Sequence, residues 1–234
     1  MKFDIWSAIF GASGLGLLKL LFDVIKYYTD RHDKQNKTEQ EFTNQQTALE
    51  QMFYELLSGA VKIQEIIEEL MIDINAARIM IVKIENGGGI PQLGTIQTMT
   101  VLNECLNRNY TPPHGKVTSI KQDFQAYTVD QTYQRLLTRT METGTYMYSV
   151  EDLNHSVFST LYRAQGIKKA ILMTITNLPT IGGDVNKGFM IFMSIQFTDD
   201  VEITPMIESE YTIAQEKIKN IYHAFYKKRI EKSK

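Results

Sequence analysis

The chain has 234 residues, 43% hydrophobic and 22% charged, which allows one large domain with a core and excludes a wholly disordered or collagen-like chain. A formal net charge of -2 provides no overall field to attract nucleic acid, so a dedicated nucleic-acid-binding protein is disfavoured. One cysteine excludes a disulfide within the chain, and four scattered histidines exclude a zinc site built from His and Cys ligands.

The N-terminal 28 residues are the most apolar part of the sequence. Only Lys19 and Asp23 carry a charge between residues 5 and 25. A membrane helix needs about 20 apolar residues, and the interval from Trp6 to Tyr27 has this length, with aromatic residues suited to both interfaces. The side chains expected to anchor this segment, in lipid or against another subunit, are Trp6, Phe10, Leu18, Phe22 and Tyr27.

Two interpretations of this apolar segment stand side by side. In the first, it crosses a membrane; because Lys26 and Arg31 follow it and only Lys2 precedes it closely, the positive-inside rule then keeps the C-terminal bulk in the cytoplasm. In the second, it packs against other subunits of an assembly such as a virion. The two interpretations predict different locations, membrane-associated or within a particle.

A polar stretch over residues 29–46 leads into a helix with a heptad pattern. From Leu49 onwards apolar residues recur at alternating steps of four and three, as in a coiled-coil seam. The pattern extends back to Phe42, so the helix is expected to begin before that residue. A second stripe, which includes Leu57 and Val61, indicates two partners for the helix: its own domain, and a second copy of the chain or another subunit. The alternative is a long helix that packs only on its own sheet. The expected oligomer seam comprises Leu49, Phe53, Leu56, Ile63, Ile67 and Leu70.

The strands of the remaining chain are expected from β-branched, apolar runs bounded by turn residues. Residues 77–85 form the first, which a turn at Asn86, Gly87, Gly88 and Gly89 is expected to end; this turn is also a possible ligand or partner loop. Residues 95–102 form a return strand and residues 117–129 a weaker candidate. Residues 145–150 form a short strand, and the clearest hairpin is formed by residues 167–177 and 188–197.

Three helices are expected among these strands. Asp130 can cap the first, which stops at Gly144, and Thr204 can cap the last, with Pro205 at its first position. The middle helix opens at Ser149 or Glu151 and ends at Gly166, and its predicted apolar face holds Leu153, Val157, Leu161 and Ala164. The last helix carries an apolar stripe formed by Ile207, Tyr211, Ala214, Ile218, Ile221 and Phe225.

This order of elements indicates an α+β fold with an antiparallel sheet flanked by helices. Over residues 45–230 it resembles a GAF domain, a relative of PAS domains that serves as a sensory and dimerisation module. The run ARIMIVKIENGGGIPQLG (residues 77–94) is also similar to uncharacterised proteins of tailed bacteriophages that join a hydrophobic N-terminal helix to a GAF-like body. The resemblance implies three parts: a hydrophobic helix (1–28), a linker with a heptad helix (29–75) and a GAF-like domain with a basic C-terminal helix (76–234).

The ligand motifs of GAF domains do not carry over to this sequence. The Asn-Lys-x-Asp-Glu motif of cyclic-nucleotide GAF domains is matched only by Asn186 and Lys187, and Cys105 lacks the histidine pair expected beside a bilin-binding cysteine. We therefore expect no cofactor. A GAF fold without these motifs implies packing or protein recognition.

No residue pattern points to catalysis or to a metal. The glycines at 87–89 lack the spacing of a phosphate-binding loop, and the pair Asp199 and Asp200 is more typical of a turn than of a cation site. His155 and Ser156 are adjacent and point apart on a helix, so they do not form a nucleophile–base pair. The sequence therefore predicts a non-enzymatic, homo-oligomeric binding or assembly module on a membrane, or alternatively a ring or connector subunit of a phage particle.

Overall fold

The computed structural model describes residues 39–89, 95, 97–107, 117–154, 156–179 and 187–232. Contacts divide the chain into two compact units, Met1–Val61 and Lys62–Lys234, which meet within helix α3 (Glu39–Asp73). The start of α3 at Glu39 confirms a helix that begins before residue 42. The predicted anchor residues Trp6, Phe10, Leu18, Phe22 and Tyr27 lie outside the described residues.

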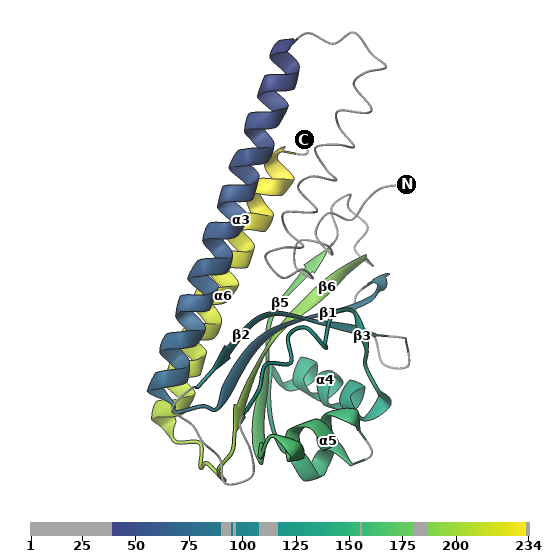
Figure 1. Ribbon diagram of the computed structural model, residues 1–234, viewed down its shortest axis with the longest axis vertical. Coiled ribbons are helices and arrows are strands. Elements are labelled where there is room, and N and C mark those ends of the chain that lie inside the picture. Colours follow the sequence, from purple (N-terminus) through teal and green to yellow (C-terminus); the bar gives the residue numbers. More distant parts are fainter. Residues whose placement is uncertain are drawn as a thin grey trace. The chain divides into compact units, whose positions relative to one another are not determined.

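Six antiparallel strands form one sheet in the order β3-β2-β1-β6-β5-β4, with helices on both of its faces (Figure 1). The predicted α+β class, with an antiparallel sheet flanked by helices, is confirmed. The strands are β1 (Arg78–Gly89), β2 (Thr98–Leu106), β3 (Tyr127–Thr128), β4 (Thr145–Ser149), β5 (Lys169–Pro179) and β6 (Lys187–Phe197).

Strand β1 lies inside the sheet, between β2 and β6, which explains its continuous apolar run. The predicted turn at Asn86–Gly89 is wrong, because β1 continues through Gly89. After an irregularity that follows Glu85, Gly89 pairs with Lys187 of β6, so a neighbouring strand supplies the backbone partners that a turn was expected to supply. The predicted strand over residues 117–129 shortens to the two residues of β3, with irregular chain before it.

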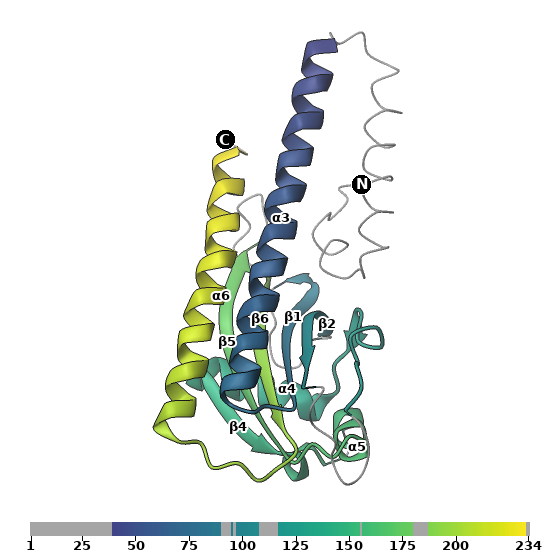
Figure 2. The same cartoon turned by 60° about the vertical axis from the view of Figure 1, so that its left-hand side comes forward.

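One face of the sheet is covered by residues 62–73 of α3 and by helix α6 (Pro205–Lys232), as Figures 1 and 2 show. Helix α3 contacts β2, since the Gln64 side chain donates to the Glu104 carbonyl oxygen at 3.3 Å. Helix α6 contacts β5, where Gln215 Nε2 donates to the Thr174 carbonyl oxygen at 2.6 Å. The predicted cap is confirmed, because Thr204 Oγ1 accepts a hydrogen bond from the amide of Ile207 at 3.3 Å.

The seam residues of α3 that the structure describes face the chain's own sheet. Ile67 is 0% exposed and Ile63 and Leu70 are 3% exposed within a single chain. Their assignment to an oligomer seam is therefore corrected: the period of the pattern was right, but the partner at these three positions is the chain's own sheet. The side chains of Leu49, Phe53 and Leu56 lie outside the described residues, and for them the oligomer seam stays a prediction.

The other face of the sheet is covered by helices α4 (Gln131–Thr143) and α5 (Val157–Ala164). Asp130 caps α4 as predicted, because its Oδ1 accepts from the Tyr133 amide at 2.9 Å, and Gly144 ends the helix with a φ of 79°. The single helix predicted over residues 149–166 is instead a 3₁₀ turn, η1 (Val150–Leu153), followed by α5.

This break between η1 and α5 changes which side chains of α5 are buried. Ser156 begins α5 as a new N-cap, its Oγ accepting from the Phe158 amide at 3.2 Å. Val157, predicted to be buried, is 52% exposed, whereas Phe158 and Tyr162 are buried. The predicted face was wrong because the second cap restarts the helix in a different phase.

Candidate functional site

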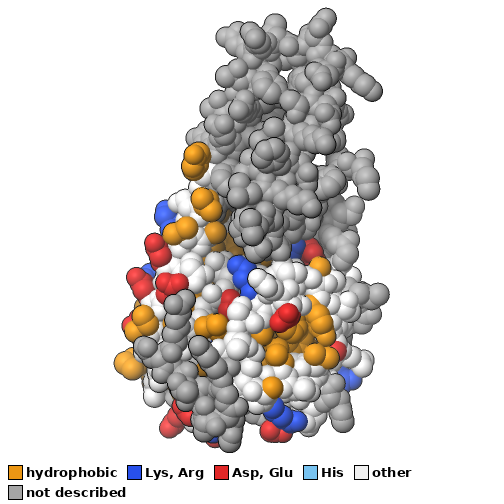
Figure 3. Space-filling model, in the orientation of Figure 1, with side chains coloured by type: hydrophobic (Ala, Val, Ile, Leu, Met, Phe, Trp, Pro, Cys, Tyr) orange, Lys and Arg blue, Asp and Glu red, His pale blue; other side chains and the backbone are white. Residues whose placement is uncertain are grey.

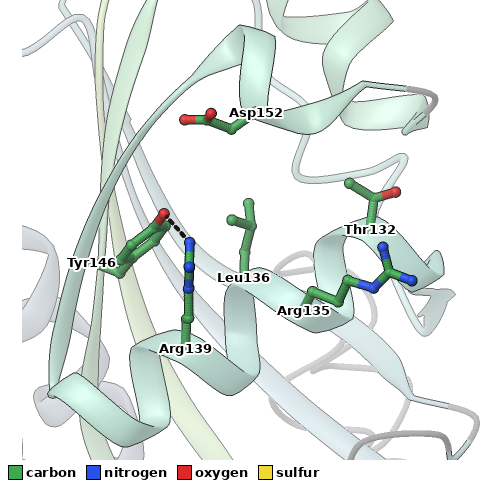
Figure 4. Close-up of a pocket in the computed structure, with 6 residues that line it drawn as sticks. All are labelled: Thr132, Arg135, Leu136, Arg139, Tyr146 and Asp152. Carbon is green, nitrogen blue, oxygen red and sulfur yellow. Dashed lines mark hydrogen bonds between the residues drawn. The ribbon is translucent and has the colours of Figure 1, made fainter.

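A pocket of about 400 Å³ lies between α4, β4 and η1, beside the edge of the sheet (Figure 4). The pocket has basic side chains from α4, an aromatic side chain from β4 and an acidic side chain from η1. Two turns of α4 supply most of its wall, because residues four apart share one face of a helix. Its lining residues are Thr132, Arg135, Leu136, Arg139, Tyr146 and Asp152.

Arg139 is held in a fixed position at one end of this pocket. Its Nη1 donates to the Tyr146 hydroxyl oxygen at 2.7 Å, and its guanidinium carbon lies 5.2 Å from the centroid of the same ring. The two contacts combine a hydrogen bond with a cation–π interaction. Arg139 therefore presents its remaining N–H groups to the pocket with little rotational freedom.

Arg135 occupies the other end, one helical turn earlier. In Figure 4 its guanidinium group points toward Thr132, while Arg139 rises toward Tyr146 and Leu136 lies between the two arginines. Arg135 is exposed and makes no ion pair with another described residue. Two guanidinium groups, one on each side of an apolar side chain, thus line the same pocket and point in different directions.

Asp152 stands across the pocket from α4. Its Oδ2 accepts a hydrogen bond from the Ser149 amide at 2.8 Å and so caps η1. This cap orients the carboxylate, and Asp152 lines the pocket on the side opposite α4 (Figure 4). The site therefore combines two positive groups with one negative group on the opposite wall.

A second polar cluster, completely buried, surrounds Arg78 at the start of β1. Its Nε and Nη2 donate to Gln196 Oε1, and its Nη1 donates to Gln165 Oε1 at 2.8 Å. Gln196 Nε2 in turn donates to the Tyr162 hydroxyl at 2.8 Å. Burial lowers the pKa of Arg78, while Tyr162 and Glu104 act in the opposite direction. The guanidinium is satisfied chiefly by neutral amide oxygens.

The only carboxylate close to Arg78 among the described residues is that of Glu104, at 3.7 Å from Nη1. Glu104 also accepts hydrogen bonds from the Ser119 hydroxyl and from the Ile120 amide, the latter at 3.1 Å. Arg78 Nη1 donates to the Thr118 carbonyl oxygen at 3.2 Å. The cluster thus fastens residues 118–120 to the end of the sheet.

Three buried tyrosines lie next to this cluster. Burial, first of all, raises the pKa of Tyr133 and Tyr148 well above the usual value, and it also raises the pKa of Tyr162. The three hydroxyls are close enough to perturb one another, yet Tyr148 Oη has no described partner in hydrogen-bonding geometry. Phe158 stacks on Tyr133 at 4.2 Å between ring centroids and on Phe124 at 5.1 Å, so side chains fill this part of the core.

The sequence interpretation missed the charged residues of both clusters. Arg135 and Arg139 are four residues apart in a helix that was predicted, so their common face could have been noted. Asp152 follows Ser149 by three residues, which is the spacing of a capping box. Arg78 lies near the start of a predicted apolar strand, and a charged residue in such a strand indicates that it has a polar partner in the core.

Among the described residues no group of three His, Cys, Asp or Glu side chains could hold a metal ion. Cys105, weighed as a possible attachment point, is buried, and its Sγ lies 3.4 Å from Met71 Sδ. His155 lies outside the described residues. No described helix is both long enough and apolar enough to cross a membrane.

The sequence matches no protein-family description and no curated protein. Several solved structures to which the chain is similar are GAF domains. One is a far-red cyanobacteriochrome photoreceptor, with a TM-score of 0.47 and 10% identity over 82% of this chain and 98% of that chain. Another is the phycocyanobilin-bound GAF domain of a cyanobacterial phytochrome, with a TM-score of 0.46 and 10% identity over 79% and 96% of the two chains.

A third similar structure is the GAF domain of a two-component sensor histidine kinase from Bacillus halodurans. It has a TM-score of 0.43 and 9% identity, over 76% of this chain and 98% of that one. All three similarities concern the fold.

Proposed function

We propose that the chain is a non-enzymatic, GAF-like binding and assembly module. The observation that carries this proposal is the pocket on α4, β4 and η1, whose charged groups are positioned for binding. Arg139 is hydrogen-bonded to Tyr146 and Asp152 to the Ser149 amide, so two of the three charged groups that line the pocket are oriented by contacts within the protein. Fixed charges of this kind recognise a ligand through electrostatics and hydrogen bonds.

In this proposal the N-terminal segment tethers the module to a membrane. The support is the bilayer-length apolar run between Trp6 and Tyr27, with basic residues after it. The module then lies on the cytoplasmic side, displayed on a helical stalk, and the gene belongs to a bacteriophage, to whose proteins the run over residues 77–94 is similar.

Membrane fractionation of the full-length chain tests this tether. We expect the chain to sediment with membranes and to be released by detergent but not by alkaline carbonate. The double variant Phe10→Arg/Leu18→Arg should move it to the supernatant, because each charge costs about 2.5–3.5 kcal/mol near the bilayer centre on insertion scales. Ile72→Arg, which adds a charge at a side chain 72% exposed on α3, is the matched control and should still sediment.

The second candidate is a structural subunit of a phage particle, such as a ring or connector. Leu57 and Val61, 44% and 50% exposed on α3, favour it, because apolar side chains along one helix are typical of contacts with another chain. This function predicts a defined oligomer and abundant peptides from the chain in purified virions by mass spectrometry. A membrane-bound chain absent from virions would exclude it.

A further inference from the structure

We propose that the pocket on α4, β4 and η1 binds a short dicarboxylate, with one carboxylate at each arginine. This inference deepens the proposed binding function by naming the class of ligand. It is carried by the arrangement of two guanidinium groups on the two sides of Leu136 (Figure 4).

The positions of the guanidinium groups favour two acidic groups over one. Arg139 is drawn toward Tyr146 by its 2.7 Å hydrogen bond, and Arg135 points the other way, toward Thr132 (Figure 4). A planar guanidinium binds a carboxylate through parallel N–H···O bonds. Since the two groups diverge, a ligand that neutralises both must carry acidic groups at its two ends.

Leu136 provides the reason for an apolar spacer between those ends. It comes from the same face of α4, between the two arginines, and contributes an apolar surface to the pocket. Two or three methylene groups of a ligand can lie over this surface and be removed from water. A volume of about 400 Å³ is ample for a molecule the size of glutarate.

Asp152 on the opposite wall limits the charge of the ligand. Its Oδ2 is held by the Ser149 amide, so the carboxylate cannot turn away without breaking the cap of η1. A third acidic group on the ligand would meet this charge and be repelled. On the face of the protein seen in Figure 3, acidic and basic side chains are interspersed.

Calorimetry of the full-length chain with glutarate at low ionic strength tests the inference. We expect saturable binding with a dissociation constant of about 1 mM or below. Inorganic phosphate carries its negative charge on a single group, and citrate has three carboxylates. Each should bind at least about tenfold more weakly than glutarate. Equal binding of glutarate and phosphate, or no saturable binding of glutarate, would overturn the proposal.

Variants locate the ligand in the pocket. Arg135→Gln and Arg139→Gln should each weaken glutarate binding by about tenfold, the loss expected for one charge-assisted contact. Arg163→Gln is the control. Arg163 is exposed, as Arg135 and Arg139 are, and it pairs with Glu151 at 2.7 Å. It lies on α5 outside the pocket, so its substitution should leave glutarate binding unchanged. Unchanged binding in both α4 variants would contradict the inference.

Asp152→Asn should change the affinity for glutarate in the opposite direction, which makes it a sharper test. The amide oxygen can still accept from the Ser149 amide and keep the cap, while the negative charge is gone. Glutarate should then bind more tightly than to the unmodified chain, and weaker binding would contradict the predicted ligand position. Membrane sedimentation does not involve this pocket, so a chain that sediments as predicted and fails to bind glutarate would reject the pocket inference alone.

Discussion

The two faces of the sheet are stabilised in different ways. On the side of α3 and α6 the strands present mainly aliphatic side chains, such as Ile81, Ile171 and Met193, to the helices. On the side of α4 and α5 the strands contribute Arg78 and Gln196 to a buried polar network, and the helices contribute the aromatic cluster around Phe158.

This difference follows from strand alternation and has an energetic consequence. Aliphatic packing is non-directional, so it tolerates a change of shape if the volume is kept. A buried polar network requires each partner to be present, because a group left unsatisfied loses its hydration without compensation. We therefore expect substitutions on the two faces to differ in size and in pH dependence.

The largest loss of stability is expected from Arg78→Ala, which removes the central side chain of the buried polar network. Removal of the guanidinium leaves Gln196, Gln165 and Glu104 without their buried partner. Loss of one partner of a buried charged network costs about 3–5 kcal/mol. Urea unfolding followed by circular dichroism measures this loss in the free energy of unfolding.

Lys169→Ala is the control for Arg78→Ala. The half-buried Lys169 pairs with the exposed carboxylate of Asp200 and donates to the Val201 carbonyl oxygen at 3.1 Å, and an ion pair with an exposed partner contributes little. Its removal should change stability by less than about 1 kcal/mol. If Arg78→Ala changed stability as little as the control does, the polar network would have no role in holding the sheet.

Ile67→Ala probes the aliphatic face and should rank second. Ile67 is 0% exposed against the sheet, and removal of buried methyl and methylene groups costs about 2–4 kcal/mol. Ile72→Ala, five residues later and 72% exposed, should stay within about 0.5 kcal/mol of the unmodified chain. Oligomer dissociation by Ile67→Ala with no loss of domain stability would instead support the seam between chains.

A third effect appears only at alkaline pH. Burial raises the pKa of Tyr133, Tyr148 and Tyr162, so above pH ~10 the unfolded chain releases protons that the folded chain retains. Stability is then fully present below pH ~10 and falls as the pH rises, with a slope of about 1.4 kcal/mol per pH unit for each such tyrosine. Burial also raises the pKa of Tyr222 on the other face, which adds to the slope.

Tyr148→Phe separates the contribution of the polar face from this total. Its hydroxyl has no described partner, so its removal should be neutral or slightly stabilising at pH 7. Between pH 10 and 11 the decline in unfolding free energy should become smaller by about 1 kcal/mol. A marked loss of stability at pH 7 would show that the hydroxyl is satisfied.

The smallest effect is expected from Asp130→Ala, at the entrance to α4. The Asp130 carboxylate caps α4 and also accepts from Ser156 Oγ at 2.5 Å, which links the N-termini of α4 and α5. Loss of an N-cap costs about 1 kcal/mol. Asp123→Ala, in the irregular chain before β3, is the control. The Asp123 carboxylate makes no hydrogen bond with the described residues, so its removal should cost less than removal of the Asp130 cap.

Much of the fold could be predicted from local signals. Asp130, Gly144 and Thr204 marked helix ends correctly, since capping is a property of a few consecutive residues. The glycines at 87–89 were misread because the outcome depended on β6, a strand about a hundred residues away. The heptad period of α3 was correct, but periodicity states which face is apolar and not what covers it.

The candidate site was harder to predict, for the same physical reason. Arg135 and Arg139 share a helix, but Tyr146 and Asp152 come from other elements, and only the packing of β4 and η1 against α4 brings them to one pocket. Arg78 and Gln196 are 118 residues apart. Such sites depend on tertiary contacts that no spacing along the chain encodes.

The inner position of β1 also bears on how the chain is made. During synthesis β1 can pair with β2 early, but its other edge has no partner until β6 leaves the ribosome roughly a hundred residues later, or after about 5–20 s at common elongation rates. In that interval an apolar strand edge is open to other nascent chains. Slower elongation should therefore lower the yield of soluble protein, and a chaperone that shields β1 should restore it.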